Sequence, residues 1–249
     1  MAPSRRELLQ GVARLSGGLA LAPVLAAMGA ESAVAVESLS SELNVCRPLG
    51  DSLTALQQGN ARFAAAWTAA AQGLTPAERM DLLQTQLDEH CLVDPDALKR
   101  GQAPWAAVLT CADSRIPLEW MFQAGAGELF AVRSAGNAVF NDGVASLEYA
   151  VAVLNVPLIL VLGHSDCGAV KAARGGDENL TPLLVELVTP IRASLQSGDD
   201  LSQAIRGNAR YSAAELVNRS ALLADAQASG KLQIVPAYFD IASGAVEFL

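Results

Sequence analysis

Basic residues are scarce in this chain, and they are not clustered. Lysine and arginine total 17 of the 249 residues against 26 acidic residues, which gives a formal net charge of -9. Nucleic-acid phosphates call for a concentrated basic surface, so the composition argues against a nucleic-acid partner. Charged residues of both signs make up 17% of the chain and apolar residues 51%, which indicates a compact folded protein and excludes a disordered one.

Cysteine and histidine are also rare. Four cysteines are too few to build a disulfide scaffold. Two of them, Cys46 and Cys91, lie outside any motif, and we expect them to be unpaired thiols, although an oxidising compartment would permit a bridge between them. The two histidines are His90 and His164, and His164 alone has a cysteine at metal-ligand spacing.

Long uninterrupted apolar runs are missing as well. The most apolar N-terminal stretch, residues 15–30, is short for a transmembrane helix, so we expect a soluble mature protein. Arg5-Arg6 precedes this stretch and Ala33-Val34-Ala35 follows it as a cleavage site. We interpret residues 1–35 as a twin-arginine-type export signal leading to a periplasm or a thylakoid lumen, and residues 36–249 as the mature domain. The alternative is an amphipathic N-terminal helix.

Two short segments carry the residues with the strongest chemical signal. They are Cys111-Ala-Asp113-Ser-Arg115 and Gly163-His164-Ser-Asp-Cys167-Gly168, and each follows an apolar, strand-like run. Two thiolates and one imidazole form a zinc-ligand set, and three protein ligands leave a fourth position open, as in catalytic zinc sites. The alternatives are a buried thiol beside a hydrogen-bonded histidine, and thiol chemistry with Cys167 as nucleophile and His164 as base.

Apolar strands and helices alternate through the rest of the chain. This alternation predicts an α/β fold with a mainly parallel central sheet flanked by helices. The helical N-terminal part, from residue 51 to 87, has no sheet of its own, and we expect it to pack on a partner subunit. The predicted strands are 105–110, 128–133, 157–162, 231–238 and 245–249; the later helices are 117–123, 143–154, 167–173, 180–195 and 213–228, and residues 94–104 are predicted as a loop.

The motifs together resemble those of β-class carbonic anhydrases. The resemblance rests on the two segments above and on Val132-Arg133-Ser-Ala-Gly136-Asn137, which lies between them. It extends to Leu56 and Gly59-Asn60-Ala-Arg62-Phe63 and to residues 230–248, so it covers essentially the whole mature chain.

The resemblance implies one zinc ion per chain, held by Cys111, His164 and Cys167. It implies that Asp113 and Arg115 form a catalytic dyad beside the fourth ligand position. Val108 replaces a tryptophan that accompanies regulatory bicarbonate in some members, which favours the open zinc site over one in which the aspartate ligates the metal. The implied assembly is a homodimer or a higher homo-oligomer. Gln102 would hydrogen-bond substrate, reaching the neighbouring subunit's site, and Phe130 and Tyr149 would line the carbon dioxide pocket unless they are ordinary core aromatics.

The implied reaction is the reversible hydration of carbon dioxide to bicarbonate and a proton, by attack of zinc-bound hydroxide. Asp113 would accept a hydrogen bond from the attacking group, and Arg115 would keep that carboxylate ionised. Two alternatives stay open at this point. The same fold could hydrolyse carbonyl sulfide or carbon disulfide, or the chain could be a zinc-bearing interaction subunit without turnover.

Overall fold

A five-stranded sheet forms the centre of the molecule. The computed structural model describes residues 50–88 and 95–249 of the chain. The strand order is β2-β1-β3-β4-β5; all neighbouring pairs are parallel except β4 and β5, which are antiparallel. The predicted α/β fold with a mainly parallel sheet is confirmed. The strands are β1 (Ala106–Cys111), β2 (Leu129–Ser134), β3 (Leu158–His164), β4 (Gln233–Asp240) and β5 (Ala245–Phe248).

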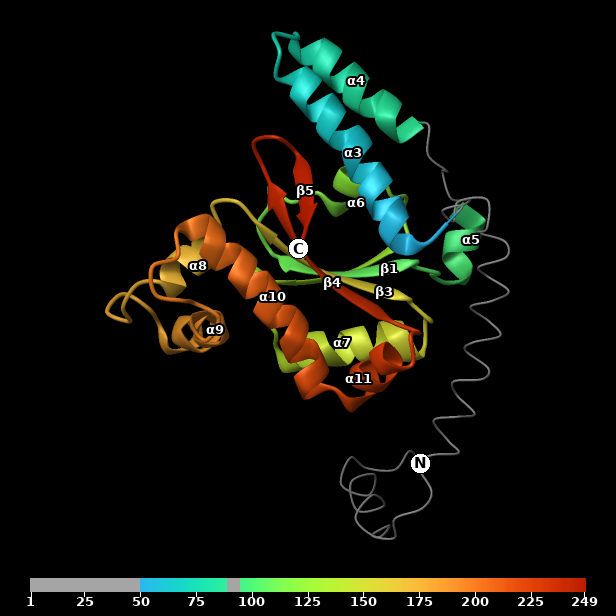
Figure 1. The fold of residues 1–249 in the computed structure, drawn as a ribbon. Helices are drawn as coiled ribbons and strands as arrows, with labels where there is room; N and C mark the ends of the chain where they lie inside the picture. Colours follow the sequence, from blue (N-terminus) through green and yellow to red (C-terminus); the bar gives the residue numbers. More distant parts are fainter. Residues whose placement is uncertain (1–49, 89–94) are drawn as a thin grey trace, which may run out of the picture.

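Helices cover both faces of this sheet (Figure 1). On one face, Leu109 and Ile159 belong to a core shared with α7 (Asn141–Ala152), α10 (Leu201–Arg219) and α11 (Ala221–Ala228). On the other face, alternate residues of the same strands pack against α3 (Ser52–Ala70) and α6 (Leu118–Phe122). Every residue of β1 and β3 is buried, because these two strands are central and covered on both sides. Two further helices, α8 (Gly168–Ala173) and α9 (Pro182–Arg192), follow β3.

The apolar stripe of α3 is covered by the chain itself. Leu56 and Phe63 are buried in the core that includes α6, and a side chain at Gly59 would collide with the carbonyl oxygen of Phe122 at 2.0 Å. Asn60 joins the helix to the β4–β5 turn, donating to the Gly244 carbonyl at 2.9 Å. This stripe therefore needs no partner subunit to bury it, and partner packing by the remaining surface of α3 and α4 (Pro76–Asp88) stays a prediction.

Two segments have a different secondary structure from the one predicted from sequence. A short helix, α5 (Pro95–Arg100), occupies the predicted 94–104 loop; Asp96 in its first turn and Lys99 in its last suit the helix dipole. The helix predicted at 213–228 is in fact two helices. The first begins at Leu201, because Asp200 and Gln203 form a capping box there, and the second begins after Ser220 caps it.

The predicted export signal, His90, Cys46 and Cys91 lie outside the described residues. Within residues 50–88 and 95–249, no helix is both long and apolar enough to cross a membrane.

Candidate metal centre

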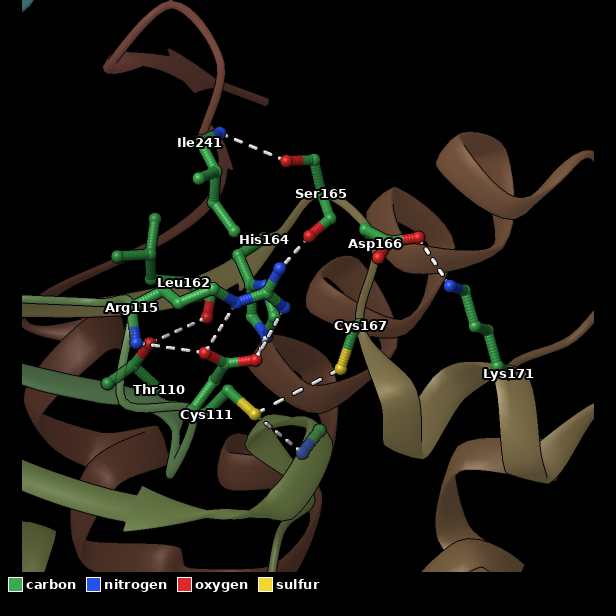
Figure 2. A network of polar contacts seen from close by, with 12 residues as sticks. Thr110, Cys111, Arg115, Leu162, His164, Ser165, Asp166, Cys167, Lys171 and Ile241 are labelled. Carbon is green, nitrogen blue, oxygen red and sulfur yellow. Dashed lines mark hydrogen bonds and ion pairs between the residues drawn. The ribbon is translucent and has the colours of Figure 1, made fainter.

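The parallel register brings the two metal segments to one edge of the sheet. Cys111 ends β1 and His164 ends β3, and adjacent parallel strands end on the same side. Cys167 follows in the loop that leads to α8, and its Sγ atom lies 4.0 Å from that of Cys111 (Figure 2). The ligand atoms of the three residues lie within 4.8 Å of one another, and all three residues are buried. The prediction that these three side chains converge is confirmed.

The His164 ring presents a free lone pair to this cluster. Its Nδ1 atom lies 2.9 Å from the Ser165 carbonyl oxygen, which can only accept, so Nδ1 carries the proton. In the neutral ring the Nε2 atom then keeps its lone pair, and it is buried without a hydrogen-bond partner. An orphaned nitrogen of this kind is costly unless a ligand satisfies it, and here two sulfur atoms converge with it. The donor set and its burial therefore fit zinc.

A hydrogen bond between the sulfur atoms of Cys111 and Cys167 shifts the pKa values of both thiols. The hydrogen bond from the Cys167 thiol lowers the pKa of Cys111 to about 4, and the same interaction raises the pKa of Cys167. The backbone N–H of Gly136 also donates to the Cys111 sulfur at 3.2 Å. The lowered pKa of Cys111 favours its thiolate, which is the form of cysteine that would bind zinc.

Asp113 stands beside the cluster in a fixed orientation. Arg115 donates from Nε to Oδ1 at 2.9 Å and from Nη2 to Oδ2 at 2.7 Å, which makes a two-point contact. The hydrogen bonds from Arg115 hold the pKa of Asp113 far below its usual range. Oδ2 lies 3.8 Å from His164 Nε2, so an ionised carboxylate borders the position that the three ligands leave free.

Comparison with known proteins identifies the family. A protein-family model described as "Carbonic anhydrase" matches residues 106–246, the part of the chain that contains all three motifs. The chain belongs to the β-class carbonic anhydrases. The carbonic anhydrase of Mycolicibacterium smegmatis is 37% identical over 204 residues, which cover 78% of this chain and 89% of that protein. Carbonic anhydrase 2 of Mycobacterium tuberculosis is 35% identical over 193 residues, covering 74% and 92% respectively.

Solved structures of the class have the same fold. A tetrameric β-carbonic anhydrase from Sordaria macrospora superimposes with a TM-score of 0.55 at 26% identity, over 62% of this chain and 84% of that one. The Coccomyxa β-carbonic anhydrase in complex with acetazolamide gives a TM-score of 0.54 at 27% identity, over 62% and 76% of the two chains.

Sequence reasoning did not identify one functional residue of this carbonic anhydrase site. Arg133 belongs to the middle motif, but the sequence assigned it no role. In the structure it donates to the Cys111 carbonyl at 3.1 Å and to the Ile116 carbonyl at 2.8 Å. It therefore clamps both ends of the loop that carries Asp113 and Arg115. The motif was a signal of importance, but the carbonyl partners depend on the tertiary structure.

The three predicted substrate residues lie elsewhere in the chain. Phe130 is in register with Ala107, four residues before Cys111, which corresponds to roughly 13 Å along the strand. The half-exposed Tyr149 packs on Phe130, with ring centroids 6.4 Å apart. Gln102 is exposed and precedes the amino end of β1. One chain therefore does not bring these residues to its own metal cluster, and their role in substrate binding stays a prediction.

Proposed function

We propose that this chain uses one zinc ion to catalyse the reversible hydration of carbon dioxide to bicarbonate and a proton. The observation that carries the proposal is the buried Cys111, His164 and Cys167 cluster, with the orphaned His164 Nε2 aimed into it beside an ionised carboxylate. Membership of the carbonic anhydrase family supports the same reaction.

The residues around the metal have separate tasks in this proposal. When bound, zinc supplies a Lewis acid that makes hydroxide available as a nucleophile near neutral pH. Asp113 stays ionised, so it accepts a hydrogen bond from the attacking water or hydroxide and orients it. Arg115 holds both carboxylate oxygens and fixes that acceptor in place. His164 is the sole histidine of the described residues, so the released proton passes to water or buffer.

The arrangement of Asp113 favours the open form of the site. Its two oxygens are both engaged by the guanidinium of Arg115, and the backbone N–H of Arg115 adds a third hydrogen bond at 2.9 Å. Oδ2 accepts only one of these three bonds, and in this proposal its remaining lone pair accepts the hydrogen bond from the attacking water or hydroxide. We therefore place Asp113 next to the fourth ligand position rather than in it.

We further propose that the working unit is at least a homodimer. Gln102, Phe130 and Tyr149 lie away from the cluster of their own chain, so they reach a carbon dioxide pocket only if a second copy supplies them. The tetrameric relative from Sordaria macrospora supports a homo-oligomer. Mixing an Asp113→Asn chain with a Gln102→Ala chain tests this, because each mixed dimer would then hold one site with both native residues. Activity above that of either variant alone supports shared sites, and activity equal to their average contradicts them.

The decisive experiment combines metal analysis with stopped-flow carbon dioxide hydration on residues 36–249. One zinc per chain and rapid hydration are expected. Zinc without turnover would instead support the non-catalytic interaction subunit. A rate of sulfide release from carbonyl sulfide or carbon disulfide that exceeds the hydration rate would assign the sulfur substrate.

Sequence features at residues 1–35 lead us to propose export to a periplasm or thylakoid lumen.

A further inference from the structure

The loop between His164 and Cys167 is tied to the C-terminal hairpin through Ser165. The Ser165 hydroxyl accepts a hydrogen bond from the backbone N–H of Ile241 at 3.0 Å, and its own backbone N–H donates to the Phe239 carbonyl at 2.8 Å. Its carbonyl oxygen is the acceptor for His164 Nδ1 at 2.9 Å. Figure 2 shows Ser165 between the histidine ring and Ile241. One residue thus links the metal-ligating imidazole to the β4–β5 hairpin.

The link continues into the N-terminal part of the chain. The carbonyl of Ile241 accepts a hydrogen bond from the indole Nε1 of Trp67 at 3.2 Å, so Ile241 is held from both sides. Trp67 lies on α3, and Asn60 of the same helix bonds Gly244 and Val246 at 2.9 and 2.7 Å. Helix α3 precedes the segment that the carbonic anhydrase family model matches, yet it is two hydrogen bonds away from Ser165.

We infer that Ser165 is a positioning residue for His164, and that Ile241 and Trp67 brace it from α3. The Ser165 carbonyl selects the tautomer in which Nε2 is free, and a carbonyl that moves would no longer select that tautomer or that ring orientation. The hydroxyl of Ser165 restrains this carbonyl by fixing the loop to Ile241. The inference rests on zinc occupying the proposed site. It adds that the hydrogen bonds from α3 through Ile241 to Ser165 slow the release of zinc.

The test measures the rate of zinc release from the full mature chain to a chromophoric chelator. Loss of an outer partner of a metal-ligating histidine typically weakens metal binding by about ten- to a hundredfold, and we expect Ser165→Ala to raise the release rate within this range. Ser165→Thr keeps the hydroxyl and should restore slow release. Glu247→Ala is the control, since Glu247 lies on β5 of the same hairpin and bonds Arg206 of α10 rather than the partners of Ser165. If Glu247→Ala released zinc as fast as Ser165→Ala, general loosening of the hairpin would explain the effect, and the inference would be overturned.

A double-mutant comparison tests the brace. Trp67→Phe keeps the aromatic ring that stacks on Phe63 but removes the N–H donor, so it should raise the release rate by a smaller factor than Ser165→Ala. Because Trp67 acts through Ser165, the double variant should release zinc no faster than Ser165→Ala alone. If the increase in release rate of the double variant equals the product of the two single-variant increases, the two residues act independently, and the proposed brace is overturned.

Two readouts separate this inference from the assignment of the metal. Zinc content of the wild-type chain reports on the site itself, and wild type without zinc would refute the proposed function instead. In the cobalt-substituted protein, the visible absorption bands should change in Ser165→Ala and return in Ser165→Thr, because they report ligand geometry. Wild-type bands and a wild-type release rate in Ser165→Ala would overturn the positioning role. If Ser165→Ala does not fold, Trp67→Phe alone must raise the release rate for the inference to stand.

Discussion

Asp113 and Arg115 form a closed unit at the edge of the metal site. The guanidinium contacts both oxygens of the carboxylate, and the backbone N–H of Arg115 bonds Oδ1 as well. Only Ser114 separates them in sequence, so the contacts within the pair are set by local chain geometry. The carboxylate is therefore ionised and oriented in the metal-free chain, before substrate or zinc arrives.

Replacement of Asp113 by asparagine should separate catalysis from metal binding. Asp113→Asn keeps the size of the side chain but offers a weaker acceptor and breaks the charge pair with Arg115. We expect full zinc content and a loss of hydration rate on the order of a hundredfold, as for a positioned proton-handling group. Asp166→Asn is the matched control, because it removes the same charge from the neighbouring loop, where Asp166 pairs with Lys171. An unchanged rate in Asp113→Asn would remove Asp113 from the mechanism.

Replacement of Cys111 by serine should remove most of the zinc. The thiolate is a charged, soft ligand, whereas a serine hydroxyl is neutral at the pH of the assay and a poor zinc ligand. The Cys111 sulfur is buried and accepts a hydrogen bond from the Gly136 N–H, which holds it in position. Metal analysis after dialysis measures the effect. Full occupancy together with full activity in Cys111→Ser would contradict the assigned ligand set.

The Asp113–Arg115 pair should make stability depend on pH in the acid range. The pKa of Asp113 is lower in the folded chain than in the unfolded chain, where it is about 3.9. The folded state therefore binds fewer protons, and the contribution of the pair is fully present above about pH 4 and is lost as the pH falls further. Urea unfolding of the metal-free wild type and Asp113→Asn measures this. The gap between their free energies of unfolding should shrink below about pH 4, and a gap that stays constant or widens would refute the ion-pair contribution.

The sequence predicted the metal cluster well because its signal is local. Cys111 and His164 each end an apolar run, and the rule that parallel strands end at one edge is enough to bring them together. Other features depend on tertiary contacts and could not be derived. The carbonyl partners of Arg133 and the bond between Ser165 and Ile241 join segments whose approach no spacing rule specifies. The start of α10 was missed for a different reason, since its capping box is a sequence signal that was overlooked.

The proposed export signal leads to a prediction that does not depend on the metal site. Arg5→Lys together with Arg6→Lys keeps the positive charge, but a receptor that recognises paired arginines should no longer export the chain. We expect the precursor to accumulate in the cytoplasm, while the wild type is exported and begins at Val36 after cleavage. Cell fractionation with N-terminal sequencing gives the answer. Equal export of the double-lysine variant would refute the twin-arginine signal and favour the alternative, an amphipathic N-terminal helix.

The clamp formed by Arg133 should matter for catalysis more than for metal retention. Its guanidinium bridges the carbonyls of Cys111 and Ile116, which lie at the two ends of the loop that carries Asp113. A lysine ammonium is a compact point charge that lacks the fork needed to hold both carbonyls in this geometry. In Arg133→Lys the loop should lose one of its two fixed ends, while the sulfur of Cys111 keeps its bond from Gly136.

We therefore expect Arg133→Lys to bind zinc fully and to lose roughly tenfold in kcat/KM, because a small misplacement of a positioned catalytic group is enough to slow the reaction. Arg174→Lys is a suitable control, since Arg174 also donates to a backbone carbonyl, that of Asp199 at 2.8 Å, but at an exposed position. The loss should be absent in this control. If Arg133→Lys instead lost zinc in proportion to its activity, Arg133 would support the ligand Cys111 and not the orientation of Asp113.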